Sequence, residues 1–186
     1  MDRCEAQAEI RRAFLQACQE RSDINEHLPM LHYLAMQCNG IVEFGVRYGV
    51  STRAFVAAML NRFGMWYEGV DLVLTPPARR IVELANAAGC VAELTQDDSR
   101  HVDFMIEPDL LFIDSDHTYE QMRAELRYAD RVRKYLVMHD TLWATDMNRA
   151  IEEFLAEHPE WVPVYKTGRN NGLTVLERQH DADASA

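Results

Sequence analysis

The stretch Ile41-Val42-Glu43-Phe44-Gly45-Val46-Arg47-Tyr48-Gly49-Val50-Ser51 decides the fold of this chain. Its first residues are mostly apolar and predict a short buried strand. The two glycines then predict a tight turn, and Ser51 is of the type that caps the start of a helix. In open α/β sheets, such a unit leaves free backbone N–H groups at the carboxyl end of the strand. Nucleotide-like ligands bind there.

Glu43 indicates which ligand the turn suits. A carboxylate disfavours a pyrophosphate and favours an ammonium or a sulfonium group. The spacing Glu43-x-Gly45-x-x-x-Gly49-x-Ser51 also differs from Gly-x-Gly-x-x-Gly, because Arg47 stands where a middle glycine would be. The residues therefore favour S-adenosylmethionine over a dinucleotide.

The composition of the chain limits the classes of protein to which it can belong. The chain has 186 residues, of which 48% are hydrophobic and 26% charged, as in a single soluble domain. A net charge of −11 disfavours nucleic acid or an anionic membrane as a partner. The four cysteines form no Cys-x-x-Cys pair, and neither a signal peptide nor a membrane-spanning run is evident. We therefore expect a cytoplasmic protein with reduced thiols.

Hydrophobic periodicity predicts two N-terminal helices, at 3–20 and 25–37, followed by alternating strands and helices. The expected strands are 41–45, 65–70, 90–94, 109–113, 135–138, 161–165 and 173–176, and the expected later helices are 51–63, 76–88, 117–134 and 145–155. Such alternation predicts a Rossmann-like, doubly wound, mostly parallel seven-stranded sheet. The last two strands can pair as a hairpin, which makes one strand antiparallel.

The domain organisation follows from the same pattern. We expect one domain over residues 1–178, with helices in 1–40 and an α/β core in 41–178. The polar residues 179–186 are expected to be a disordered tail.

Acidic or polar residues lie at the carboxyl end of each of the first five predicted strands. They are Glu43, Asp71, Asp98 with Ser99, Asp114, and His139 with Asp140. One such residue is typical of a turn or a helix cap, but five in succession at one edge of a parallel sheet favour a ligand crevice. In that crevice Asp71 is placed to bind ribose hydroxyls, and Asp98 and Ser99 to lie near the adenine amino group. Ser51 and its helix N-terminus can face the carboxylate of the methionine moiety.

A second constellation lies at the ends of the fourth and fifth strands. Adjacent strand ends bring Asp114 close to His139 and Asp140, and these three can hold a divalent cation with open positions. Mg²⁺ suits an oxygen-rich site, whereas an imidazole also admits Mn²⁺, Fe²⁺ or Zn²⁺. His117 lies about one turn past Asp114, where a neutral imidazole can act as a general base. Ser115 or Asp116 is expected to cap the helix that follows.

These motifs resemble those of class I S-adenosylmethionine-dependent methyltransferases of the family-24 type, which are similar to macrocin and catechol O-methyltransferases. The resemblance rests on Glu43-x-Gly45-x-x-x-Gly49-x-Ser51, on Asp114-x-Asp116-His117-x-Tyr119-Glu120 and on His139-Asp140. The run Ser22–Pro29 also resembles the segment that precedes the core in small members of the family. The resemblance covers about residues 22–177.

The resemblance implies roles for single residues. Glu43 and the backbone of Asp114 would hold the methionine amino group, and Ser51 its carboxylate. Asp71 would bind the ribose, and Asp98 and Ser99 the adenine end. Asp114 and Asp140 match metal-ligand positions and His117 matches the base.

Two departures from the family stand out. His139 lies where metal-dependent relatives often carry Asp or Glu, and imidazole is a less natural Mg²⁺ ligand. Only about 40 residues precede the first strand of the core. This implies a large acceptor in an open cleft or a neighbouring subunit that completes the site, and we expect a possible homodimer.

The sequence thus predicts metal-assisted O-methylation of a small-molecule acceptor, such as a sugar, a phenol or a natural product. Two alternatives stay open. One is an NAD-dependent oxidoreductase on a similar sheet, and the other is a non-catalytic module that binds S-adenosylmethionine or a partner protein.

Overall fold

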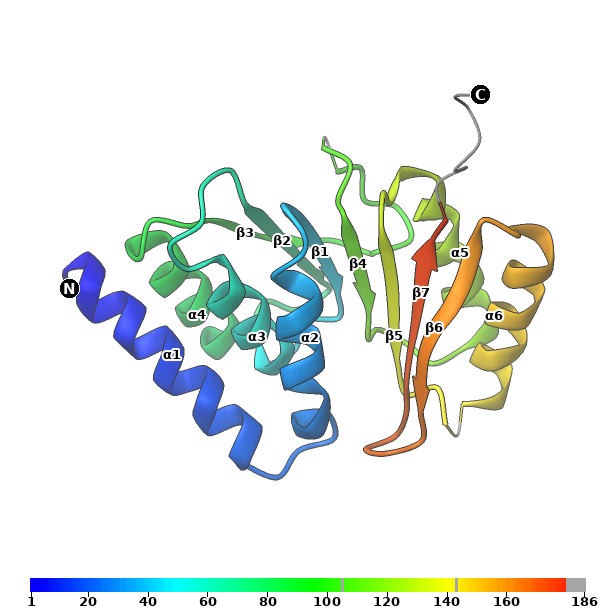
Figure 1. Ribbon diagram of the computed structural model, residues 1–186, viewed down its shortest axis with the longest axis horizontal. Helices are drawn as coiled ribbons and strands as arrows, with labels where there is room; N and C mark the ends of the chain where they lie inside the picture. The colour runs from blue at the N-terminus through cyan, green and yellow to red at the C-terminus, as the bar shows by residue number, and fades with distance from the viewer. Residues whose placement is uncertain (105, 143, 180–186) are drawn as a thin grey trace.

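The core of the molecule is one seven-stranded sheet, shown in Figure 1. A computed structural model describes residues 1–104, 106–142 and 144–179. The strands are β1 (Gly40–Phe44), β2 (Trp66–Asp71), β3 (Val91–Gln96), β4 (Leu110–Ile113), β5 (Tyr135–His139), β6 (Trp161–Thr167) and β7 (Leu173–Arg178). Their order in the sheet is β3-β2-β1-β4-β5-β7-β6.

The direction of the strands confirms the predicted fold class. β1 pairs in parallel with β2 and β4, and β4 pairs in parallel with β5. β7 runs antiparallel to both of its neighbours, β5 and β6. This is the mostly parallel, doubly wound sheet with one antiparallel strand that the sequence predicts. Within the β6–β7 hairpin, β7 is the strand that lies between β5 and β6.

Helices cover both faces of the sheet. The helices are α1 (Arg3–Gln19), α2 (Leu28–Ala35), α3 (Val50–Met59), α4 (Pro76–Ala87), α5 (Tyr119–Leu126) and α6 (Thr145–Glu157), with 3-10 turns at Asn25–His27 and Arg127–Arg131. Figure 1 shows α1 to α4 gathered on one side and α5 and α6 on the other. No described helix is both long and apolar enough to cross a membrane.

Residues of the central strands alternate between two hydrophobic cores. Ile41 and Phe112 pack under the first four helices, whereas Val42 and Ile113 pack under α5 and α6. All five residues of β1 are buried, as expected for a parallel strand covered on both faces. Because side chains alternate along a strand, Glu43 shares the face of Ile41 and points toward α3.

Several helix boundaries differ from the predictions. The helix predicted over 51–63 ends at Met59, because left-handed residues at Asn61 and Gly64 turn the chain back. Phe63 lies in this turn and is 94% exposed. The helix predicted over 117–134 is α-helical only to Leu126, and the one predicted over 25–37 begins with a 3-10 turn.

The predicted helix caps are also partly wrong. Gly49, with a φ of 69°, occupies the N-cap position of α3, and Ser51 lies inside the helix. Thr118 caps α5 in place of Ser115 or Asp116, since its side chain accepts a hydrogen bond from the Gln121 N–H. α6 begins at Thr145 with Ala144 in the N-cap position, and no side-chain hydrogen bond caps it.

Candidate active site

A groove crosses the carboxyl ends of the strands at the point where β1 and β4 separate, which is the switch point of a doubly wound sheet. It consists of two hollows that share Gly45, Arg47, Asp114 and Ser115. The outer hollow, of about 370 Å³, is also lined by Asp71, Asp98, Ser99 and Gln121. The inner hollow, of about 550 Å³, is also lined by Asp23, Tyr48, Ser51, His117 and Asp140.

Gly45 forms the saddle between the two hollows. Its φ is +88°, and a Cβ placed on it would lie 2.1 Å from the backbone oxygen of Asp114. No other residue fits this approach of β1 to β4. Gly49 differs, because a Cβ there would contact Ile81 at 3.1 Å under α4. Gly45 therefore shapes the groove, whereas Gly49 shapes the turn and its packing.

Glu43 lies beneath the groove and does not line it. Its carboxylate has no exposed surface and accepts hydrogen bonds from Thr52 Oγ1 at 2.8 Å, from Tyr67 Oη at 2.5 Å and from Ser51 Oγ. Burial raises the pKa of this carboxyl to about 7, against the effect of the three hydroxyls. In the described structure the Glu43 carboxylate thus bonds hydroxyls of α3 and β2. The contact of Glu43 with a ligand amino group stays a prediction from the sequence.

Ser51 lies between the buried Glu43 and the inner hollow. Its hydroxyl donates to Glu43, yet the residue also lines the inner hollow. As the second residue of α3, it presents its backbone at a helix N-terminus that opens on the groove. The expectation that this end of α3 faces an anionic group fits that position.

Asp71 lies at the end of β2, in the outer hollow, as predicted. Its Oδ2 accepts a hydrogen bond from the backbone N–H of Arg47 at 2.7 Å, and its Oδ1 accepts one from Val73 at 3.0 Å. Each carboxylate oxygen keeps a further lone pair. The two backbone donors thus hold the carboxylate in a fixed orientation at the edge of the groove.

Asp98 and Ser99 both line the outer hollow, but both side chains already have hydrogen-bond partners within the protein. Arg100 Nη2 lies 2.5 Å from Asp98 Oδ2, and this hydrogen-bonded pair lowers the pKa of Asp98 to about 2. The Ser99 hydroxyl donates to Glu125 Oε1 at 2.5 Å. The structure therefore places these residues where the sequence predicts, with partners that the sequence does not reveal.

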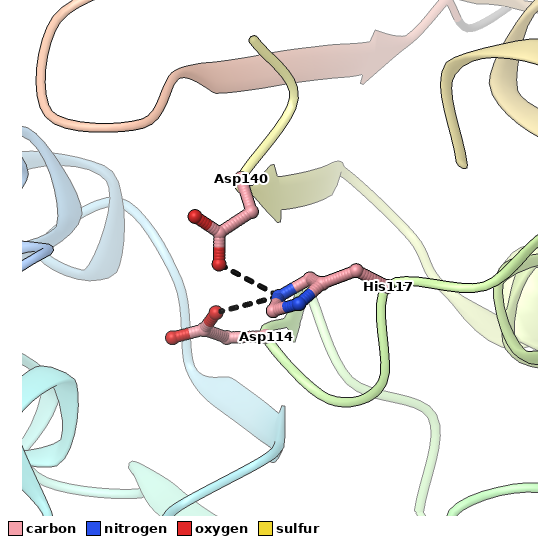
Figure 2. A group of neighbouring side chains, drawn as sticks. All are labelled: Asp114, His117 and Asp140. Atoms are coloured by element: carbon pink, nitrogen blue, oxygen red, sulfur yellow. Dashed lines mark ion pairs between the residues drawn. The ribbon is translucent and has the colours of Figure 1, made fainter. Parts of the chain in front are cut away.

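Asp114, His117 and Asp140 converge at the inner hollow (Figure 2), where one potential ligand atom from each lies within 4.8 Å of the others. The His117 Nε2 is 2.6 Å from Asp140 Oδ2 and 3.8 Å from Asp114 Oδ1. The two carboxylates raise the pKa of His117 to about 9. Figure 2 shows the imidazole pointing between the two acids, which come from the ends of β4 and β5.

His139, one of the three predicted metal ligands, lies beside this group, and both of its ring nitrogens have oxygen partners. Its Nδ1 is 3.0 Å from Asp114 Oδ1, and its Nε2 is 3.1 Å from the carbonyl oxygens of Asp23 and Asn170. Burial opposes a charge on the ring, but Asp114 and Asp140 raise its pKa to about 10. Because both ring nitrogens face oxygen acceptors, neither has a lone pair directed at a cation. His139 thus holds the N-terminal segment and the β6–β7 hairpin against β5.

Asp140 has an unusual backbone and an unsatisfied oxygen. Its φ is +59°, and the residue is 5% exposed. Burial alone would raise the pKa of this carboxyl, but His117 and His139 lower it. Among the described residues its Oδ1 has no hydrogen-bond partner. A buried acceptor of this kind is costly unless a donor or a cation reaches it.

Sequence patterns do not single out Gln121, Glu125 or Asp23. Gln121 lines the outer hollow, and the fully buried Glu125 bonds three residues around it. The i, i+4 spacing of Gln121 and Glu125 on a predicted helix is the signal that pairs them. Two further predictions fall outside the described residues. They are Trp143, for which the sequence leaves open a pocket wall or packing under the next helix, and residues 180–186 of the expected disordered tail.

The comparisons with known proteins agree with this geometry. The family model described as "Methyltransferase domain", of family 24, matches residues 42–141, which include all the predicted site residues. The comparison with curated proteins finds no match.

Solved structures share the fold at low sequence identity. An O-methyltransferase from Bacillus cereus in complex with SAH is 15% identical, covers 94% of this chain and 91% of its own, and has a TM-score of 0.67. The O-methyltransferase TomG from Streptomyces achromogenes in complex with SAM is 16% identical, with 90% of each chain covered and a TM-score of 0.67. The N-methyltransferase NodS from Bradyrhizobium japonicum is 14% identical, covers 85% and 97%, and has a TM-score of 0.60.

The family model spans more than half of the chain, and the sheet, the glycine saddle and the acidic strand ends match what the sequence predicts for that family. The chain therefore belongs to the family-24 class I S-adenosylmethionine-dependent methyltransferases.

Proposed function

We propose that this protein binds S-adenosylmethionine along the groove and transfers its methyl group to a hydroxyl of a small-molecule acceptor, with help from a divalent cation. The observation that carries the proposal is the group Asp114, His117 and Asp140 at the inner hollow, beside the Gly45 saddle. The structures of similar fold were solved with SAM or SAH in two of the cases above. The family match argues against the oxidoreductase alternative.

The cofactor would lie with its ribose at Asp71, because a fixed carboxylate that lines the groove can accept hydrogen bonds from vicinal hydroxyls. Its adenine would extend into the outer hollow toward Ser99. The methionine carboxylate would face the N-terminus of α3, where unpaired backbone N–H groups favour an anion. Glu43 would act from below, through the Ser51 and Thr52 hydroxyls that it holds.

The residues at the inner hollow fit a cation. Asp140 Oδ1 is a buried acceptor without a hydrogen-bond partner among the described residues, and Asp114 supplies a second carboxylate. Carboxylate oxygens are the donors that Mg²⁺ prefers. When bound, such an ion would lower the pKa of an acceptor hydroxyl.

His117 is our candidate for the general base. Its Nε2 faces the same space as the two carboxylates, which raise its pKa. Once a cation bound to those carboxylates offsets their charge and lowers that pKa, the neutral imidazole can take a proton from a hydroxyl oriented by Asp140. The same atom can instead serve as a third ligand, but it cannot do both at once. Holding the acceptor oxygen in line with the methyl group would supply much of the rate.

The test is methyl transfer from labelled S-adenosylmethionine to panels of sugars, phenols and natural-product alcohols, with matched amines because NodS is an N-methyltransferase. Methylation of a hydroxyl supports the proposal, and methylation of amines alone contradicts it. His117→Gln with a Mn²⁺ titration separates the two roles of His117. Lost turnover with unchanged Mn²⁺ affinity supports a base, whereas loss of both indicates a ligand.

A further inference from the structure

Glu125 is a buried acidic residue that is hydrogen-bonded to three residues lining the outer hollow. It lies on α5 with no exposed surface. Its Oε1 accepts hydrogen bonds from Ser99 Oγ at 2.5 Å, from Ser115 Oγ at 2.7 Å and from Gln121 Nε2 at 2.8 Å. These three residues come from the turn after β3, the turn after β4 and α5 itself. One carboxylate therefore fixes three segments that surround the hollow.

The network also sets the orientation of the Gln121 amide. Its nitrogen donates to Glu125 Oε1 at 2.8 Å and to Ser99 Oγ at 2.9 Å, which uses both N–H bonds. If the amide were rotated by half a turn, its oxygen would face a carboxylate oxygen. It would also face a Ser99 hydroxyl whose hydrogen is already donated to Glu125. The amide oxygen is thus the part of Gln121 that can serve a ligand in the outer hollow, which Gln121 lines.

Asp98 is the other acceptor in reach of the same space. Both of its oxygens lie against Arg100, with Nε at 2.9 and 3.0 Å and Nη2 at 2.5 Å, and Oδ1 also accepts from the Arg100 backbone N–H at 3.0 Å. The charge of Asp98 is therefore largely committed to Arg100. The Gln121 oxygen has no such competitor in the network.

We propose that Gln121 accepts a hydrogen bond from the exocyclic amino group of adenine, and that Glu125 is the positioning residue that turns the amide oxygen toward it. This inference rests on the proposed function, because it takes S-adenosylmethionine as the cofactor. An acceptor oxygen held in this way selects a 6-amino purine and rejects a 6-oxo purine, whose carbonyl would face it.

The experiment compares two ligands by calorimetry. One is S-adenosylhomocysteine and the other is its deaminated analogue S-inosylhomocysteine, in which a carbonyl replaces the amino group. We expect the wild-type protein to prefer the amino compound by about tenfold or more. Gln121→Leu should bring that ratio close to one. Glu125→Gln, which lets the Gln121 amide rotate, should lower it several-fold while the analogue binds as before. The exposed Glu152→Gln on α6 removes the same charge elsewhere and should keep the full ratio.

The ratio of the two affinities separates recognition from general damage. Equal loss of affinity for both ligands, with a lower melting temperature, would show a merely structural role for Glu125 and overturn the inference. A full ratio in Gln121→Leu, or a ratio that collapses only in Asp98→Asn, would also overturn it. If the wild-type protein binds neither ligand, the proposed function itself fails.

Discussion

The two hollows of the groove differ in how far their buried carboxylates are satisfied by hydrogen bonds. In the outer hollow, two hydroxyls and one amide satisfy the buried carboxylate of Glu125, and Arg100 pairs with Asp98. In the inner hollow, carboxylates face imidazoles, and Asp140 Oδ1 has no hydrogen-bond partner among the described residues. A satisfied network suits recognition of one unchanging ligand. An unsatisfied buried charge suits a site that is completed only when a cation or an acceptor arrives.

The largest effect should come from the inner hollow. We expect Asp140→Asn to lower kcat by roughly 10²–10⁴-fold, because the charge that orients the acceptor and pairs with His117 is lost. Asparagine tolerates the left-handed φ of +59°, so the fold should survive. Steady-state kinetics measure kcat, and S-adenosylhomocysteine titrations measure the affinity for the cofactor. A large loss of cofactor affinity with kcat intact would contradict the assignment of this hollow to the acceptor.

The saddle between the hollows should be the next most sensitive point. Gly45→Ala places a Cβ 2.1 Å from the Asp114 oxygen, so β1 and β4 must move apart. We expect a loss of roughly 3 kcal/mol in the free energy of unfolding, together with weaker cofactor binding. Gly64→Ala is the matched control, because Gly64 also has a positive φ, of 75°, but has nothing within 4 Å of the added Cβ. It should lose only about 1 kcal/mol. Equal losses in both variants, measured by urea denaturation, would show that the close approach is unimportant.

Glu43 should give the protein a pH-dependent stability. Burial raises its pKa to about 7 in the folded state, from the ordinary value of 4.5. Between these values the folded state binds a proton that the unfolded state lacks, so stability falls as pH rises through this window and stays lower above it. Glu43→Gln removes the titration. At pH 8 it should be more stable than the wild type by up to about 3 kcal/mol, given about 1.4 kcal/mol per pKa unit, and nearly equal to it at pH 5.

The exposed Glu93→Gln on β3 serves as the control for Glu43→Gln and should change nothing at either pH. Urea denaturation at both pH values measures the differences. If Glu43→Gln destabilises the protein equally at pH 5 and pH 8, the buried carboxylate is charged throughout, and it is then held by its three hydroxyls.

The smallest effect is expected at the ion pair between Arg47 and Asp23, which spans the mouth of the inner hollow. Its atoms lie 3.2 Å apart, but the side chains are 71% and 50% exposed. Arg47→Ala should therefore change stability by less than about 1 kcal/mol. The backbone N–H of Arg47, which orients Asp71, is unaffected by that change. A fall of several degrees in the melting temperature would show that this ion pair contributes more to stability than an exposed pair does.

The sequence predicts the sheet and the position of the site because both depend on local patterns. Buried apolar runs define the strands, and the residues after each run fall at one edge of a parallel sheet. Asp71, Asp98, Ser99, Asp114 and Asp140 therefore lie where they are expected.

What the sequence does not predict is which neighbour each polar group contacts. The bonds from Glu43 to hydroxyls of α3 and β2 depend on alternation within β1 and on how α3 packs. His139 is held by carbonyl groups of Asp23 and Asn170, which are distant in the chain. Glu125 resembles any polar residue on a helix until the two turns that it holds are in place. Long-range contacts of this kind need the folded structure.

The most direct test of the central claim is a calorimetric titration with S-adenosylhomocysteine, with NADH as comparator and with Mg²⁺ present or absent. We expect micromolar binding of S-adenosylhomocysteine, no binding of NADH, and a marked loss of affinity in Asp71→Ala. Absence of binding by S-adenosylhomocysteine under both conditions, or preferential binding of NADH, would contradict the assignment of this groove to S-adenosylmethionine.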